Sequence, residues 1–406
     1  MNTFRLILIL LLTFPLAGLA APRIVGGSDA SVAPGWMASL QARSANAQIA
    51  LGHLCGASLI AADWVMTAAH CVDGAGTVER SVLLGRLSNA VDEANEIAID
   101  QIVLHPEWQG ITSGTTADLG LFLHDIALLH LTRRQAATPI TLATPSEQES
   151  LVRFQAIDAL GWGATDSNGT RYPYLLQRVS LPYLGKEYNY ILPDHLFAGG
   201  NSDQGICFGD SGGPLLSGNT QYGLSSFVLS QNSASTILCG LSSTLGGFTS
   251  VADHRGWILQ QIQGLNYGNY QHLQLASGET RTVPFVIRNQ DSVDWTLGSV
   301  ASDVTLADDQ CSQQRLRPND YCLLQVRYTG ADNQRNDLRT LTFSASSSRG
   351  SLSGTMRLEV YNPSATSDSS DVTASGSGSG SGGGAASGLL LLLAGAWGWR
   401  AIRHAR

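Results

Sequence analysis

Three side chains far apart in the chain are of the types that together activate a serine hydroxyl. His70 lies in a Thr-Ala-Ala-His-Cys segment, Asp125 begins Asp-Ile-Ala-Leu-Leu, and Ser211 is central in Gly-Asp-Ser-Gly-Gly-Pro. A serine hydroxyl is a weak nucleophile until a neighbouring base takes its proton. An imidazole can accept that proton and return it to a leaving group, and a buried carboxylate holds the imidazole in the required tautomer. The three residues therefore predict attack by Ser211 on an acyl carbonyl, with His70 as the base and Asp125 as its partner.

The glycine two residues before the serine extends this prediction. Gly209 has no Cβ, so its amide can approach a reacting carbonyl closely and form an oxyanion hole with the amide of Ser211. Each segment also has a plainer interpretation: Gly-Asp-Ser-Gly-Gly is ordinary turn chemistry, and Asp118 competes with Asp125 for the acid role. Only Asp125 opens an apolar strand-like run, and the plainer interpretations do not explain why the segments occur together.

A fourth segment, Arg-Ile-Val-Gly-Gly at 23–27, precedes the other three. In the chain order His, Asp, Ser, these segments resemble the trypsin/chymotrypsin family of serine endopeptidases over roughly residues 24–264. The resemblance implies an all-β fold with two six-stranded antiparallel β-barrels, a C-terminal helix and the triad in the cleft between the barrels. It also implies activation by a cut after Arg23. The freed ammonium of Ile24 would then pair with Asp210, because a buried carboxylate needs a partner.

The same resemblance maps a substrate pocket onto six residues: Gly205, Ile206, Ser226, Phe227, Val228 and Gly246. Gly205 occupies the pocket floor, where an aspartate would bind Arg or Lys. Burying such a cationic head without an anion is costly, and Val228 narrows the pocket wall. We therefore expect small to medium apolar residues before the scissile bond, and activation by another protease. An Asp203 that enters the pocket would restore a trypsin-like preference, and this alternative stays open.

Six cysteines in an exported chain indicate three disulfides. The family pattern pairs four of them and leaves two outside the protease: Cys55 with Cys71, Cys207 with Cys239, and Cys311 with Cys322. No Cys-x-x-Cys or clustered His/Cys pattern predicts a metal site, and no cofactor is expected. The family's calcium loop keeps Glu93 and Glu96, but Arg86 replaces the first acidic ligand and is expected to pair with Glu96.

Composition shifts divide the rest of the chain. Residues 1–20 form a secretory signal with a basic start and an apolar run, which leaves 21–23 as a short propeptide. Residues 24–264 contain short apolar or alternating runs typical of strands, such as Ile97–Leu104, and Val251–Ile262 is expected to form the closing helix. Residues 265–362 are predicted to be an immunoglobulin-like β-sandwich of about seven strands. Its strand candidates are 282–287, 303–306, 321–328, 340–343 and 356–360.

The C-terminal region is a Ser/Gly-rich linker, 363–388, followed by an apolar stretch and a basic end, 389–406. The apolar stretch is shorter than the roughly 17 residues that a membrane span needs, but Trp397 and Trp399 beside arginines suit a membrane interface. This tail resembles the GlyGly-CTERM sorting signal of Gram-negative bacteria, and the whole layout resembles the extracellular serine proteases of Vibrio. The resemblance implies transient membrane anchoring, removal of the tail by a rhomboid-type protease, and release or surface display through a type II secretion system. A C-terminal anchor that is never cleaved is the alternative.

The net charge of −8 and the pI near 5.5, without a basic stripe, argue against nucleic acid as a partner. Protein or peptide substrates are therefore expected. The sandwich contains no catalytic constellation, which favours a positioning role for it. A different class of function is a catalytically inactive protease fold that binds a surface through the sandwich.

Overall fold

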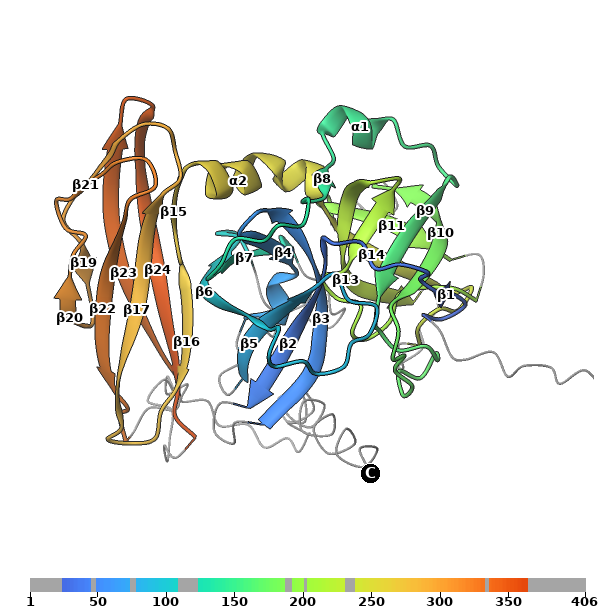
Figure 1. Cartoon of the computed structure of the whole chain (residues 1–406), viewed down its shortest axis with the longest axis horizontal. Coiled ribbons are helices and arrows are strands. Elements are labelled where there is room, and N and C mark those ends of the chain that lie inside the picture. The colour runs from blue at the N-terminus through green and yellow to red at the C-terminus, as the bar shows by residue number, and fades with distance from the viewer. Residues whose placement is uncertain are drawn as a thin grey trace, which may run out of the picture.

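The computed structural model describes residues 24–44, 49–73, 78–108, 123–186, 192–200, 203–230, 238–332 and 336–363. The predicted signal and propeptide, the linker beyond Pro363 and the C-terminal tail lie outside these residues, as does Asp118. Figure 1 shows a region of two β-barrels beside a separate sandwich, with helix α2 extending between them. No helix in the described part of the chain is long and apolar enough to cross a membrane.

The first barrel is closed, because the first and the last strand in its pairing order also pair with each other. Its six strands pair in the order β2-β3-β4-β7-β6-β5, and β5 returns to β2. They are β2 (Met37–Ser44), β3 (Ile49–Ala61), β4 (Trp64–Thr67), β7 (Ala127–Leu131), β6 (Ile97–Leu104) and β5 (Val78–Leu84). The predicted run Ile97–Leu104 is one whole strand. Asp125 lies just before β7, so the residue predicted to open that strand lies in the preceding turn.

The second barrel closes in the same way, in the order β9-β10-β11-β14-β13-β12, with β12 paired back to β9. Its strands are β9 (Ala156–Gly161), β10 (Gln177–Gly185), β11 (His195–Gly199), β14 (Thr244–Ser250), β13 (Thr220–Ser230) and β12 (Pro214–Ser217). Short strands β1 (Ser28–Asp29) and β8 (Thr141–Leu142) pair with β10 and β13. The two six-stranded antiparallel barrels confirm the predicted fold class.

Two helices accompany the barrels. Helix α1 (Pro145–Glu149) starts at a capping box, in which Thr144 and Glu147 satisfy each other's backbone amides. Helix α2 (Val251–Gln263) starts at Ser250, whose side chain accepts the amide of Asp253 at 3.2 Å. The predicted closing helix is therefore present. It packs Val251 and Ile258 into the core of the first barrel.

The sandwich follows directly, since β15 starts at Leu265. One sheet contains β15 (Leu265–Tyr267), β17 (Thr280–Asn289), β22 (Tyr321–Thr329) and β20 (Thr305–Asp309). The other contains β21 (Arg315–Leu316), β18 (Trp295–Leu297), β23 (Asn336–Ser347), β24 (Gly350–Tyr361) and β16 (Tyr270–Gln274), with β19 (Ala301–Ser302) beside β23. Alternate residues of both sheets form one buried core. The described residues thus form ten strands after α2, β15 to β24, and not the seven or so that were predicted.

Strand β16 joins the sandwich to the first barrel, as Figure 1 shows. It pairs parallel with β24, and Tyr270 also pairs with Ile102 of β6. The Asn269 side chain binds Leu104 through two hydrogen bonds of 2.8 Å, one to its amide and one to its carbonyl. Farther along, Gln101 Nε2 donates to the carbonyl of Val286 at 2.8 Å. These directional bonds fix the sandwich against the first barrel.

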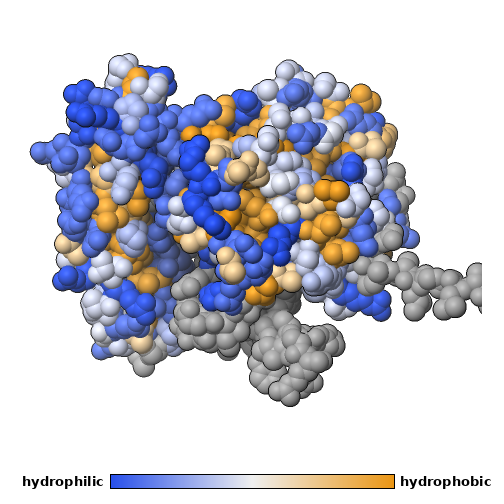
Figure 2. Space-filling view, in the orientation of Figure 1, coloured by the Kyte–Doolittle hydropathy of each residue, from blue (hydrophilic) through white to orange (hydrophobic). Residues whose placement is uncertain are grey.

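Figure 2 shows the hydrophobic residues of this face in several separate patches, with hydrophilic residues between them. Among the described residues, the large apolar side chains that remain exposed include Tyr172 (41%) and Phe208 (45%).

Candidate active site

The structure brings His70 and Asp125 together at one end of the first barrel. His70 lies in the 3-10 turn η1 (Ala69–Cys71), directly after β4. Asp125 accepts the backbone N–H of His70 at Oδ1 (2.9 Å), and its Oδ2 lies 2.7 Å from His70 Nδ1. One carboxylate therefore binds both the backbone and the ring of His70. These two hydrogen bonds restrain the turn that carries His70 and also restrain rotation of its imidazole ring.

Two residues of the second barrel donate hydrogen bonds to Asp125. Ser226, on β13, donates its hydroxyl to Asp125 Oδ2 at 2.5 Å, and Thr249 Oγ1 donates to the Asp125 carbonyl at 3.1 Å. Asp125 is fully buried. Burial by itself would raise the pKa of its carboxyl, but the charge of His70 and these hydrogen bonds lower that pKa overall.

The interaction between His70 and Asp125 shifts the pKa of His70 in the opposite direction. Burial would lower the pKa of the imidazole, but the charge of Asp125 and its hydrogen bond raise the pKa above its ordinary value. A more basic imidazole accepts a proton more readily. The ring nitrogen that does not face Asp125 is Nε2, which is the atom that can serve as a base.

The turn that carries Ser211 packs against the segment that precedes His70. Gly56 of β3 donates its amide to the Ser211 carbonyl at 2.7 Å. Gly212, with φ of +73°, has no room for a Cβ, which would collide with Thr67 Oγ1 and approach Ala68 N. Ser211 itself is half-buried. The second barrel thus presents Ser211 beside the segment that leads into His70.

Gly209 occupies a backbone conformation that glycine favours, with φ of +96°. Its carbonyl lies 3.0 Å from His53 Nε2, and His53 Nδ1 lies 2.6 Å from Ser39 Oγ. Burial lowers the pKa of His53 to about 4, so the ring is neutral and donates one N–H. This hydrogen bond holds the peptide between Gly209 and Asp210 in one orientation.

Asp210 is the most perturbed carboxyl of this region. It is 1% exposed and accepts the amides of Gly163 (2.7 Å) and Cys207 (2.9 Å). Burial raises its pKa to about 7 in spite of these two bonds. Ile24 is fully buried in the core of the second barrel. Arg23, the predicted cleavage position, lies outside the described residues.

The predicted pocket residues lie on three neighbouring segments of the second barrel. Val228 of β13 pairs directly with Gly246 of β14. A Cβ on Gly246 would lie 3.1 Å from Ile206 Cγ1, and one on Gly205 would lie 3.0 Å from Gly240 Cα. Val228, Gly246 and Ile206 therefore lie together, and Gly205 directly precedes Ile206 in the chain.

Three residues need separate description. Ser226 binds Asp125, as given above, and Phe227 packs with Phe197 and His195, with ring centroids 6.3 and 5.1 Å apart. Phe227 is thus part of the core between β11 and β13. Asp203 is exposed, and its backbone carbonyl packs against Gly26.

The disulfides of the structure join Cys55 with Cys71, Cys207 with Cys239, and Cys311 with Cys322. The first links β3 to the turn carrying His70, and the second links two segments around the pocket.

The expected pairing of Arg86 with Glu96 is wrong. Arg86 binds Asp92 at 2.5 Å, because Asp92 is the carboxylate nearest along the same loop. Glu96 accepts the Ser81 hydroxyl at 2.7 Å and lies 3.7 Å from Arg43, which also binds Glu93 at 3.2 Å. Two arginines therefore neutralise the carboxylates of this loop.

Sequence reasoning missed a group of histidines. The ring nitrogens of His105, His124 and His254 lie within 4.8 Å of one another. Burial, followed by the charges of the other two rings, lowers the pKa of His105 to about 3. Their wide separation in the chain hides this group from any spacing pattern. Cys55, His70 and Cys71 also lie close together, but both cysteines are in a disulfide and are not metal ligands.

Sequence reasoning also missed Phe208 and Tyr172. Phe208 directly precedes Gly209, and Tyr172 Cε1 lies 3.6 Å from the position of a Cβ on Gly209. Both rings are partly exposed. The only local signal in the chain was the aromatic residue directly before the predicted oxyanion glycine.

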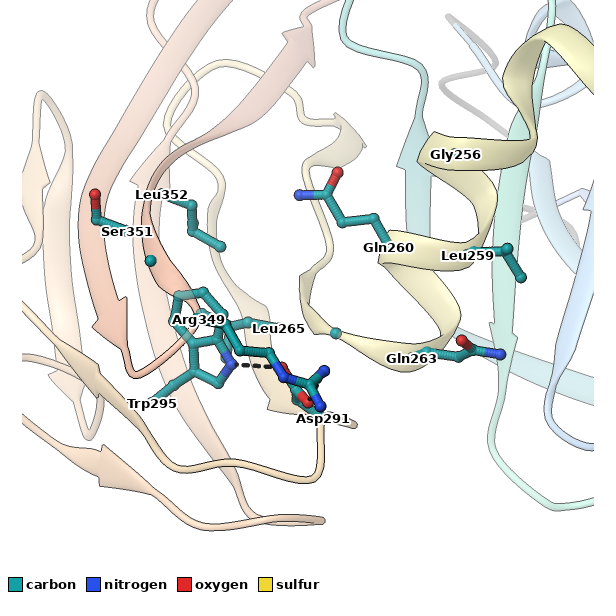
Figure 3. A pocket seen from close by; sticks show the side chains of 12 residues that line it. Gly256, Leu259, Gln260, Gln263, Leu265, Asp291, Trp295, Arg349, Ser351 and Leu352 are labelled. Carbon is teal, nitrogen blue, oxygen red and sulfur yellow. Dashed lines mark hydrogen bonds and ion pairs between the residues drawn. The ribbon is translucent and has the colours of Figure 1, made fainter.

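A cavity of about 440 Å³ lies away from this site, between α2 and the sandwich (Figure 3). Arg349 and Trp295 meet Asp291 there, with distances of 2.7 Å (Arg349 NH1 to Oδ1) and 3.3 Å (Trp295 Nε1 to Oδ2). It contains none of the predicted site residues.

The model of the trypsin family matches residues 24–258. The chain therefore belongs to the trypsin family and is a serine endopeptidase of that family. It is 32% identical to human chymotrypsin-like elastase family member 1 over 264 residues, which are 58% of this chain and 91% of that protein. It is 29% identical to phenoloxidase-activating factor 3 of Holotrichia diomphalia over 269 residues, 59% of this chain and 73% of that protein.

Two solved structures share the fold over most of the chain. The Vibrio cholerae protease VesB superposes with a TM-score of 0.56 at 23% identity, over 84% of this chain and 100% of VesB. The secreted serine protease VesC from the same organism superposes with a TM-score of 0.57 at 20% identity, over 82% of this chain and 71% of VesC. At these identities the likeness concerns the fold.

Proposed function

We propose that the chain hydrolyses peptide bonds through an acyl-enzyme on Ser211. Ser211 Oγ attacks the carbonyl carbon while His70 Nε2 takes its proton, and the resulting oxyanion accepts the amides of Gly209 and Ser211. His70 then gives the proton to the leaving amine, and a water molecule, deprotonated by His70, releases the acyl group. The observation that carries the proposal is the buried Asp125 carboxylate, which binds both the backbone and the ring of His70.

Activation by a cut after Arg23 is supported by the surroundings of Asp210. A carboxyl whose pKa burial raises to about 7 gains stability from a nearby cation. An ammonium at Ile24, which is already buried in the same barrel, would supply that charge and hold the Gly209 amide in place. Arg23→Gln should block processing and leave the chain without amidase activity.

For specificity, we propose that residues before the scissile bond are small to medium and apolar. Val228 pairs with Gly246 in the sheet, and Ile206 Cγ1 lies 3.1 Å from the position of a Cβ on Gly246, so we assign these three residues to the wall and base of the proposed pocket. The exposed position of Asp203 disfavours the trypsin-like alternative. On the other side of Gly209, Phe208 and Tyr172 offer aromatic surface to the residues after the scissile bond.

The sandwich fits a positioning role. The Tyr270 hydroxyl of β16 lies between two carboxylates and can donate its hydrogen to either: Glu359, at 3.1 Å, or Asp73, three residues after His70. Asp73 also accepts the Trp108 indole at 2.6 Å. We propose that the sandwich supports the back of the loop that carries His70.

We further propose export of the chain and processing of its tail, in line with VesC, the secreted Vibrio cholerae protease that shares its fold. Mass spectrometry of the mature protein tests this. Loss of the residues after 388 supports removal of the tail by a rhomboid-type protease, and an intact C-terminus on a membrane-bound protein supports the permanent anchor.

The experiment for the catalytic proposal is a peptide-library profile of the chain processed at Arg23, with Ser211→Ala as the matched control. Cleavage after Ala or Val that is absent from the control is expected. No cleavage by the processed chain would favour the alternative of an inactive fold that binds through its sandwich. Dominant cleavage after Arg or Lys would overturn the pocket assignment alone.

A further inference from the structure

Three histidines from separate parts of the protease converge behind Asp125. His105 follows β6, His124 directly precedes Asp125, and His254 lies in the first turns of α2. The His105 ring stacks on His124 with centroids 4.7 Å apart, and it meets His254 edge-on at 5.0 Å. His124 Nδ1 and His254 Nε2 are only 3.1 Å apart.

The hydrogen bonds of two rings fix which nitrogens face one another. His254 Nδ1 lies 2.7 Å from the Ser250 carbonyl and must donate its proton there, which leaves the lone pair on Nε2. His124 Nδ1 faces that lone pair at 3.1 Å and donates its hydrogen to it, while His124 Nε2 lies 3.4 Å from Glu107 Oε2. A metal ion would replace this hydrogen, and His124 would then carry its proton on Nε2, toward Glu107. Histidines that bind a metal almost always donate their other ring N–H in this way. His105 Nδ1 accepts a weak hydrogen bond from the Glu107 amide at 3.3 Å. Among the described residues, this is the one bond that His105 would lose if Nδ1 bound a metal ion.

The separation of the nitrogens suits one ion. With Zn–N bonds of about 2.0–2.1 Å, two ligands of a tetrahedral zinc lie about 3.3 Å apart, which is close to the 3.1 Å observed. Asp194 Oδ2 lies 3.7 Å from His124 Nδ1 and 3.8 Å from His254 Nε2. It therefore adds a negative charge beside the three neutral ligands.

The backbone also favours a dedicated site. His124 has φ of +52°, a left-handed conformation that costs energy in a residue other than glycine. Asp194 Oδ2 holds this conformation by accepting the His124 amide at 2.7 Å. The side chains of His105 and His124 are partly exposed, so an ion can enter from solvent.

We propose that His105, His124 and His254 bind one divalent transition-metal ion of the zinc class, with Asp194 beside it. Imidazole nitrogens suit zinc, and oxygen-rich sites suit calcium or magnesium. The bound ion links the end of β6, the turn before β7 and helix α2. It thus ties the closing helix to the strand ends that position Asp125, and it stabilises the folded protease because the unfolded chain lacks the site.

Cobalt and zinc titrations of the full chain test the site. The parent protein is Ser211→Ala, which excludes self-cleavage. Co²⁺ should give the visible absorption of a tetrahedral ion with one equivalent bound per chain, and Zn²⁺ should displace it and raise the melting temperature. His105→Gln and His254→Gln should each weaken Co²⁺ binding at least tenfold and abolish the thermal shift.

His130→Gln is the matched control, because His130 is another buried histidine of the same barrel and lies 2.5 Å from the Asp100 carboxylate. It should bind Co²⁺ like the parent. Circular dichroism without metal shows whether each variant folds, and if His254→Gln does not fold, the partly exposed His105 supplies the comparison with the parent. Absence of binding to the parent, or equal binding by the parent and a folded His105→Gln, would overturn the proposal.

Discussion

Replacing Val228 with glycine should change which residue the protease accepts before the scissile bond. In the structure Val228 pairs with Gly246, and Ile206 lies beside Gly246, which is the basis for assigning the valine side chain to one wall of the proposed pocket. Val228→Gly removes three carbon atoms from that wall. The neighbouring disulfide between Cys207 and Cys239 keeps the surrounding segments linked.

The size of the effect follows from burial. A larger substrate side chain that fills the vacated space buries about three more methylene equivalents, worth about 2.4 kcal/mol in the transition state. This corresponds to a change of about 60-fold in the ratio of kcat/KM for Phe over Ala before the scissile bond. The expected change is in relative specificity, since uniform losses from a more flexible strand affect both substrates alike.

The assay compares peptide p-nitroanilides that differ only in that residue, on enzymes processed at Arg23. Val228→Thr is the control, because threonine has nearly the same shape and should keep the preference for small residues. An unchanged Phe/Ala ratio in Val228→Gly, with activity retained, would refute the assignment of Val228 to the pocket wall.

Three further predictions follow from the site and its supports. Since Asp125 raises the pKa of His70, kcat/KM should fall as the pH drops through a value above 6.5, and an acid limb centred lower would contradict this. Ser226→Ala removes a 2.5 Å bond to Asp125 and should lower kcat on the order of tenfold at unchanged KM. The neighbouring Ser225 is the control, because its buried hydroxyl has no hydrogen-bond partner among the described residues, and Ser225→Ala should have little effect on kcat. Asn269→Ala removes both bonds to Leu104 and should cost about 1–3 kcal/mol by calorimetry. Gln271→Ala, a half-buried neighbour that loses only a 3.3 Å bond to the Pro284 carbonyl, should cost less.

The barrels and the helix were predictable because their residues carry strong local signals. The predicted run Ile97–Leu104 begins and ends at the same residues as β6. The predicted helix Val251–Ile262 ends one residue before α2 does. Helix α1 was missed, although Thr144 and Glu147 have the spacing of a capping box.

The sandwich was predicted less completely. Strands β23 and β24 each span 12 residues, but their Ser- and Gly-rich parts contain few of the apolar residues that mark a strand. Strands β18, β19 and β21 have three residues or fewer, too few for an alternating pattern to show.

Tertiary contacts limited the prediction of the site. Motif spacing identified His70, Asp125 and Ser211, but nothing local links Ser226 to Asp125 or joins the three histidines behind it. Arg86 was assigned to the wrong carboxylate because the loop brings Asp92 closer than Glu96. Such pairs depend on how loops fold back, which periodicity does not report.

The most direct test of the central claim is to identify the residue that reacts with a fluorophosphonate probe in the chain processed at Arg23. Tandem mass spectrometry should locate one adduct, on Ser211, and replacing His70 with alanine should slow its formation by orders of magnitude. An adduct on another residue, or labelling of Ser211 that proceeds equally fast without His70, would contradict the account.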